Sequence, residues 1–177
     1  MTEYHPGLDG VIATESSISD IDGEKGILSY RGYSIEELAE KSTFEETAFL
    51  LLTGELPTKT ELENFQSNIA DSMELPAELL DLLRAYPKKS DSMFVLQSVI
   101  AVLGSYYSVD FDAEKLKKNN YTKDYYLKVS AILLGSIGSV VATWNRIKNK
   151  KDVISPDKGM NYAQNFMLML DDSISTS

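Results

Sequence analysis

Two aspartates that stand two residues apart are the first candidates for chemistry in this chain of 177 residues. Asp20 and Asp22 fall on one face of a predicted strand, a spacing that suits an acid/base pair or one corner of a metal site. Gly23 follows Asp22 directly, however, and Asp-Gly is typical of a turn with a solvated carboxylate. We therefore interpret the pair as part of a turn, and predict no catalytic, cofactor-binding or metal-binding residue here.

The amino-acid composition of the chain excludes most other catalytic groups. The chain has no cysteine, which excludes disulfides, thiolate catalysis and cysteine metal sites. Its one histidine, His5, lies in a Tyr-His-Pro-Gly opening that is typical of a mobile terminus. Three lysines, Lys115, Lys117 and Lys118, suggest an anion site, but the acids beside them favour a solvated connection. No cofactor is expected.

The charge balance is strongly acidic. Seventeen Lys and Arg against 27 Asp and Glu give a formal net charge of −10. Such a surface disfavours nucleic acid and anionic membranes as partners. The first ten residues are polar and acidic, unlike a secretory signal or an Arg-rich transit segment. We therefore expect a cytoplasmic protein with no nucleic acid or membrane partner.

A β-hairpin and a series of capped helices must position any functional side chain. β-Favouring residues on both sides of residues 22–26 predict the hairpin. Gly54 and Pro57 predict the end of the second helix. A capping box, in which a hydroxyl and a carboxylate three residues later satisfy free amides, is also predicted for three helix starts. These starts are Ser34 with Glu37, Ser42 with Glu45, and Thr58 with Glu61.

Helical periodicity continues beyond Pro57. Pro76 is expected in the first turn of a short leucine-rich helix that ends by Pro87, and Ser90 or Asp91 is expected to cap the next helix. Apolar residues three or four apart predict the core-facing side of two helices. These faces are Leu62, Phe65, Ile69 and Met73, and Met93, Leu96, Ile100, Leu103 and Tyr107.

A long helix over residues 122–149 has two contact faces. Gly135 and Gly138 suggest close approach of another helix, because glycine inside a helix costs about 1 kcal/mol relative to alanine. The uncharged stretch 129–145 is shorter than the roughly 20 residues of a membrane span, which argues against insertion. One face is bulky and the other is a ridge of small residues. The bulky face is Tyr126, Val129, Leu133, Ile137, Val140, Trp144 and Ile147, and the ridge is Ala131, Gly135, Ser139 and Thr143.

The segment 14–57 resembles the opening of the citrate synthase and 2-methylcitrate synthase family. The resemblance rests on SSIS, IDG, KG, YRGY, ELAEKS, FEE and LLLTGELP in this order and spacing, with weaker matching in 93–106 and 159–170. It implies a mainly α, citrate-synthase-like, multi-helical large domain with a short N-terminal β-hairpin, in truncated form. The expected parts are an arm and hairpin (1–33), a helical part (34–170) and a polar tail (171–177).

The resemblance also implies an activity. Family members are acyltransferases of the tricarboxylic acid cycle that join acetyl-CoA to oxaloacetate and release citrate and CoA. They use an aspartate, two histidines and substrate arginines, in motifs beyond the point where this sequence ends, so no catalytic residue is carried over. We expect this chain to be an amino-terminal segment that is inactive alone, whether it is a short gene product, a frameshifted product or an engineered fragment. The alternative is a non-catalytic helical dimerisation or regulatory module derived from the family.

Family members are also homodimers in which long helices pack across the subunit interface. The resemblance predicts either a homodimer or association with the missing C-terminal part, since faces such as Met160, Ala163, Met167 and Leu170 would lack cover. Many members have His-Pro where this chain has Asp91-Ser92. Whether the partner of the interface is a second subunit or another part of the same fold stays open. The candidate interface residues are Leu96, Ile100, Leu103, Ala131, Gly135, Gly138 and Ser139.

Overall fold

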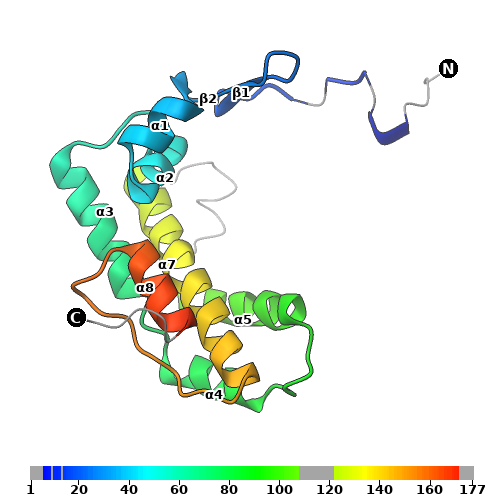
Figure 1. The fold of residues 1–177 in the computed structure, drawn as a ribbon, viewed down its shortest axis with the longest axis vertical. Coiled ribbons are helices and arrows are strands. Elements are labelled where there is room, and N and C mark those ends of the chain that lie inside the picture. The colour runs from blue at the N-terminus through cyan, green and yellow to red at the C-terminus, as the bar shows by residue number, and fades with distance from the viewer. Residues whose placement is uncertain (1–5, 9, 13, 108–121, 172–177) are drawn as a thin grey trace. The chain divides into compact units, whose positions relative to one another are not determined.

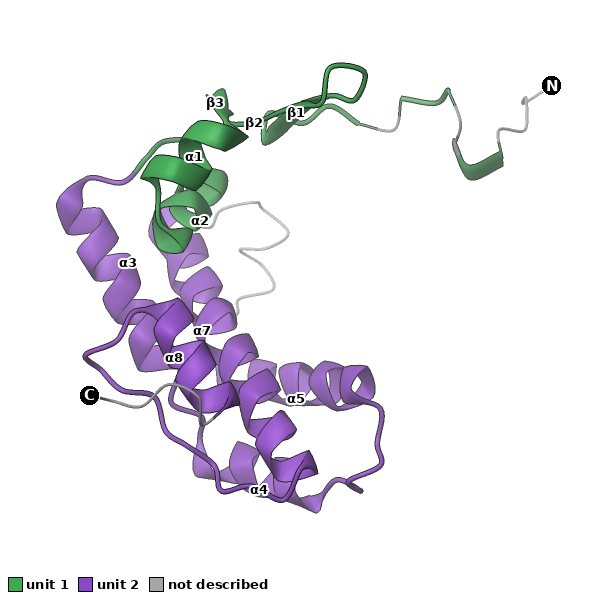
Figure 2. Ribbon diagram, in the orientation of Figure 1, with its two compact units in different colours: residues 1–56 green, residues 57–177 purple. Residues whose placement is uncertain are grey.

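The computed structural model describes residues 6–8, 10–12, 14–107 and 122–171. The chain divides into two units, Met1–Leu56 (unit 1) and Pro57–Ser177 (unit 2) (Figure 2). The domain limits expected after residues 33 and 170 stay predictions.

Unit 1 contains the expected hairpin and one further strand. Strand β1 (Ser19–Asp22) pairs antiparallel with β2 (Ile27–Tyr30), and β2 pairs with the short β3 (Tyr33–Ser34), which was not expected. A short 3₁₀ helix, η1 (Pro6–Leu8), precedes them.

Each turn of this sheet has its own local cause. The Asp22 carboxylate accepts hydrogen bonds from the Lys25 amide at 3.0 Å and from Lys25 Nζ at 2.8 Å. The second turn consists of Arg31 and Gly32, whose φ angles of 50° and 89° are both positive, as a tight turn with the twist of a hairpin requires. The glycine adopts this conformation without steric cost.

Helices α1 (Ile35–Lys41) and α2 (Phe44–Thr53) follow in unit 1. Ser34 caps α1 by accepting from the Glu37 amide, but the Glu37 carboxylate bonds Lys41 Nζ at 3.2 Å instead of closing the box. The expected cap of α2 at Ser42 and Glu45 is wrong by one residue. Thr43 and Glu46 form the capping box there, because the Ser42 amide already closes α1 and Glu45 is buried.

The end of α2 is as predicted. Gly54 adopts a left-handed conformation with φ of 92°, and its amide donates to the Leu50 carbonyl at 2.8 Å. This is the usual C-terminal role of glycine, which has no Cβ to oppose a positive φ.

Unit 2 is built on one long helix. Helices α3 (Lys59–Ser72), α4 (Ala77–Ala85), α5 (Ser92–Tyr106) and α8 (Tyr162–Leu170) all pack against α7 (Lys123–Lys148) (Figure 1). The start of α3 at the Thr58 and Glu61 capping box is confirmed, and so is the cap of α5 at Asp91. Pro76 occupies the N-cap position of α4, one residue before the expected first turn.

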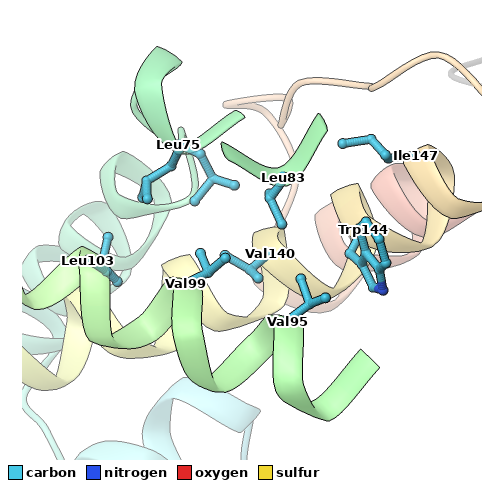
Figure 3. Packing of buried hydrophobic residues seen from close by; sticks show 9 residues of the cluster. Leu75, Leu83, Val95, Val99, Leu103, Val140, Trp144 and Ile147 are labelled. Atoms are coloured by element: carbon cyan, nitrogen blue, oxygen red, sulfur yellow. The ribbon is translucent and has the colours of Figure 1, made fainter. Parts of the chain in front are cut away.

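Side chains of α4, α5 and α7 form one buried cluster of unit 2, and Met73, Ala142 and Met169 form a second. Figure 3 shows Leu83, Val95, Val99, Leu103 and Val140 pointing toward one another from these helices. The expected face of α5 is wrong in part, because Val95, Val99 and Leu103 are buried whereas Met93 is 59% exposed.

The prediction that α7 is too short to span a membrane, which was based on the uncharged stretch 129–145, is wrong. By length and composition the helix could cross a bilayer. Its 26 residues include a window apolar enough to cross a bilayer, and half of that window is buried inside the protein. Because a core helix of a soluble protein meets the same criteria, this is weak evidence for a span.

Candidate functional site

The small-residue ridge of α7 is buried against another helix of the same chain. Gly135 faces the main chain of α3 so closely that a Cβ atom there would stand 2.5 Å from the Ile69 carbonyl oxygen and 2.9 Å from Ser72 Cβ. The neighbouring Ser136 hydroxyl donates to the Ser72 carbonyl oxygen at 3.2 Å. The close approach predicted from the glycine is therefore made by α3.

Helix α8 approaches α7 closely at Gly138. A Cβ atom at this position would stand 2.7 Å from Tyr162 Oη, and the Tyr162 hydroxyl donates to the Leu134 carbonyl at 3.1 Å. The buried Ser139 hydroxyl lies 3.9 Å from Met169 Sδ as a weak donor. Gly135, Gly138 and Ser139 thus contact helices of their own chain, and Ala131 on the same ridge is fully buried. A subunit contact at these positions stays a prediction.

The bulky face of α7 is only half covered. Val140, Trp144 and Ile147 belong to the buried core with α4 and α5, as predicted. In contrast, Leu133 and Ile137 are 39% and 38% exposed. The amino-terminal half of this face is therefore not core, although its sequence period is unbroken.

Two apolar grooves run along the contact of α5 with α7. One has a volume of about 240 Å³ and is lined by Met93, Leu96, Val141 and Trp144 among others. The second has about 260 Å³ and is lined by residues that include Ile100, Leu103 and Leu133. The three interface candidates on α5, Leu96, Ile100 and Leu103, thus all line a groove.

The amino-terminal end of α5 is fixed to α7 by polar contacts. Trp144 Nε1 donates to Ser92 Oγ at 3.2 Å, and Lys148 Nζ reaches Ser92 Oγ and the Ser90 carbonyl oxygen at 3.4 Å each. Lys88 Nζ lies 5.8 Å from the centre of the Trp144 ring, within the range of a cation–π contact. The hydroxyl of Ser92 is the shared acceptor of Trp144 and Lys148.

Two polar clamps, one at the buried Asn165 and one at the half-buried Arg31, were missed by the sequence analysis. Asn165 is 1% exposed, donates to the carbonyls of Asp157 and Met160, and accepts from the Asp157 amide, so it fixes the loop before α8. Arg31 bonds Ser17 and the Leu51 carbonyl. In the sequence, Asn165 directly precedes the apolar run 166–170, and Arg31 lies in the YRGY motif.

The candidates for chemistry do not converge. Asp20 is exposed, and Asp22 is bound by Lys25, whose side chain and amide hold the pKa of that carboxyl below its usual value. The described part of the chain contains no group of three His, Asp or Glu side chains able to hold a metal ion. His5, Lys115, Lys117 and Lys118 lie outside the described residues.

Comparison with known proteins decides the family. Residues 7–177 match the family described as "Citrate synthase, C-terminal domain". The chain belongs to the citrate synthase family. Citrate synthase from Synechocystis sp. is 35% identical over 168 residues, which are 94% of this chain and 40% of that protein. The mainly α, citrate-synthase-like fold expected from the sequence is therefore confirmed.

Solved structures of the family agree. Citrate synthase from Pyrobaculum aerophilum matches with a TM-score of 0.84 and 36% identity over 93% of this chain and 41% of that one. Citrate synthase from Thermoplasma acidophilum, solved as a ternary complex with carboxymethyl coenzyme A and oxaloacetate, matches with a TM-score of 0.82 and 26% identity over 96% of this chain and 42% of that one. The chain thus spans about two fifths of the length of these citrate synthases.

Proposed function

We propose that this chain is the amino-terminal, large-domain part of a citrate synthase type acyltransferase and that it has no activity alone. The observation that supports this is the match of nearly the whole chain to about two fifths of citrate synthases. The family description names a C-terminal domain. The amino-terminal placement rests on the motifs between residues 14 and 57, and belongs to the proposal.

The proposed reaction is the condensation of acetyl-CoA with oxaloacetate. A relative was solved with a coenzyme A derivative and oxaloacetate, which supports this substrate class. The chemistry implied by the family requires two histidines to stabilise the enol and polarise the ketone, whereas this sequence has one histidine. The chain would supply a scaffold on which the remaining catalytic part packs.

A thiol-release assay with acetyl-CoA and oxaloacetate tests this function. The purified chain should release no CoA alone, and should restore activity when mixed with the other three fifths of a homologous citrate synthase. A matched sample of the Gly135→Leu variant should fail to restore activity, because the α3–α7 contact has no room for a side chain. CoA release by the chain alone would show that it carries catalytic groups of its own.

We also propose that the chain forms a homodimer through the two α5–α7 grooves. The exposed apolar side chains Leu133, Ile137 and Val141 beside these grooves support a protein partner there. Of the side chains expected to lack cover, Ala163 and Met167 are exposed, whereas Met160 and Leu170 are half-buried. If the mixture remains inactive while the dimer forms, the alternative is favoured, a non-catalytic dimerisation or regulatory module. The expected location of either is the cytoplasm.

A further inference from the structure

The hairpin of unit 1 leaves apolar side chains outside the core of its own unit. The buried apolar side chains of unit 1 are Leu38, Phe49 and Leu50, all on α1 and α2. In the hairpin region, by contrast, Ile21 is 69% exposed and Ile27 is 52% exposed. Ile18, just before β1, is 46% exposed. These β-branched residues suit a covered sheet better than a solvated one.

Strand β1 is also an edge of its sheet. The strand order is β1-β2-β3, so among the strands that the structure describes β1 has a neighbour on one side only. The Arg31 amide donates to the Ile18 carbonyl at 2.9 Å, and the pairing of Asp20 with Ser29 continues this register. Because main-chain groups alternate in direction along an antiparallel strand, the amides and carbonyls of Ser19 and Ile21 point to the open side.

This edge has little of the usual protection against pairing. Natural edge strands often carry lysine, proline or a bulge that blocks another strand. Here β1 reads Ser-Asp-Ile-Asp, with acids in place of lysines. A partner strand that carries basic side chains would therefore be neither blocked nor repelled at this edge.

The charge of unit 1 determines what kind of strand would fit. Residues 1–56 contain twelve Asp and Glu but three Lys and Arg, whereas the remaining residues contain fifteen and fourteen. Nearly the whole net charge of the chain therefore belongs to unit 1. Its three basic side chains are already engaged, since Lys25 binds Asp22, Lys41 binds Glu37, and Arg31 binds Ser17 and the Leu51 carbonyl.

We propose that the open edge of β1 binds an extended, basic polypeptide segment, which pairs with Ser19 and Ile21 as an added strand. Main-chain hydrogen bonds supply affinity in this mode of recognition, and alternate side chains supply specificity. Apolar side chains of the partner would cover Ile21, and its basic side chains, on the opposite face of the strand, would lie near Asp20. Asp20 is exposed, and so are Glu15 and Glu24 beyond the two ends of β1. This surface is formed by residues of unit 1, whereas the α5–α7 grooves are lined by residues of unit 2, so the inference does not depend on the function proposed above.

Binding of a labelled peptide to the full chain tests the proposal. The probe is a peptide of alternating lysine and valine, with an alternating glutamate and valine peptide of equal length as its control, and affinity is read by fluorescence anisotropy. The basic peptide should bind at least about tenfold more tightly than the acidic one. Its affinity should fall severalfold when salt rises from about 50 to 300 mM, because screening weakens attraction between exposed charges.

Two variants separate strand addition from attraction by charge alone. Ile21→Pro removes an amide that points away from β2, so the hairpin should persist, which far-UV circular dichroism and the melting temperature check. It should weaken peptide binding at least about tenfold, whereas Ile21→Val, which keeps the amide, should change it less than about twofold. Asp20→Asn should weaken binding about threefold.

Several outcomes would overturn the proposal. Equal affinity of the wild type and a folded Ile21→Pro chain would show that the edge is not used. Equal binding of the acidic peptide would contradict the charge argument. The chain could bind neither peptide and still form dimers. If Ile21→Pro abolished those dimers, the edge would pair with a second copy of the chain instead.

Discussion

At the scale of residues, the two glycines inside α7 determine how closely its neighbours approach. Gly135 lies under the main chain of α3, and Gly138 lies under the ring of Tyr162. Both positions were predicted from the sequence as sites of close approach, because a helix does not retain interior glycine without a reason. Which helix makes the approach was not predictable, since α3 and α7 are far apart in sequence.

Gly135→Ala is expected to destabilise the protein. The new Cβ would stand 2.5 Å from a main-chain oxygen that cannot move independently, so overpacking should cost about 1–3 kcal/mol. Urea denaturation followed by circular dichroism measures this change. Gly104→Ala in α5 is the matched control, because among the described residues no atom outside its own stretch of helix lies within 4 Å of its Cβ position, and it should stabilise by up to about 1 kcal/mol. A neutral Gly135→Ala would show that α3 does not pack as described.

Ser92→Ala should weaken the contact between the amino-terminal end of α5 and α7. The substitution removes the acceptor of Trp144 Nε1 and Lys148 Nζ, which should cost about 1 kcal/mol. Trp144 is the only tryptophan, so its emission reports this site, and it should shift to longer wavelength as water replaces the hydroxyl. Ser92→Thr keeps the hydroxyl and should leave emission unchanged. Ser92→Pro should lose the same bond but recover part of the stability, since proline suits a first helical turn.

At the scale of elements, predictions were most accurate where the cause is local. The caps at Ser34, Thr58 and Asp91, the stop at Gly54 and the hairpin turn depend on residues within a few positions of each other. The cap of α2 was misplaced by one residue because Ser42 and Thr43 both offer a hydroxyl with a glutamate three residues later. Thr43 is the cap because the Ser42 amide is already used at the end of α1.

Faces of helices were harder to predict than their limits. α5 carries apolar residues on several sides, so periodicity did not distinguish the buried line through Val95 and Val99 from the one through Met93. The bulky side of α7 was predicted as continuous core, but the described helices bury only its carboxyl-terminal half. Which face is buried depends on the neighbouring helix, and that information is absent from the local pattern.

The capping box of α3 should make stability depend on pH in the acid range. The Thr58 amide and hydroxyl, aided by Lys123, hold the pKa of Glu61 below its ordinary value of 4.5. A carboxyl group whose pKa is lowered by folding stabilises the fold at pH values above its unfolded-state pKa. That contribution is lost as the pH falls through its folded-state pKa. The melting temperature of Glu61→Gln should therefore be below that of wild type near pH 6, and the difference should shrink below pH 4.5. A difference that is constant down to pH 3 would contradict this assignment.

At the scale of the whole molecule, the fold and family were both predictable, whereas the site was predictable only as a set of helix contacts. The motifs between residues 14 and 57 identified the family, and the comparisons confirmed it. The candidates on α7 contact α3 and α8 within the chain, and the candidates on α5 line the grooves. Burial on α7 could not be assigned from sequence, because apolar and small residues alike suit an intramolecular or an intermolecular contact.

Ile137→Glu is expected to prevent assembly of the chain without unfolding it. Ile137 is 38% exposed on α7, so a carboxylate there can reach water in the monomer but would be desolvated in a dimer. Sedimentation velocity should show a dimer for the wild type and a monomer for the variant, with similar melting temperatures. Thr60→Glu, which adds the same charge at an exposed position of α3, should remain dimeric. A monomeric wild type, or a dimeric Ile137→Glu, would place the partner surface elsewhere.

The central position of α7 also sets the timing of folding during synthesis. Ser136 of α7 bonds the carbonyl of Ser72 in α3 across 64 residues. A ribosome that adds about 5–20 residues per second needs roughly 3–13 seconds to make that stretch. During this interval the apolar sides of α3, α4 and α5 emerge before the helix that covers them. Slower translation of residues 73–136 would lengthen that exposure and raise the fraction of nascent chains that aggregate or require a chaperone.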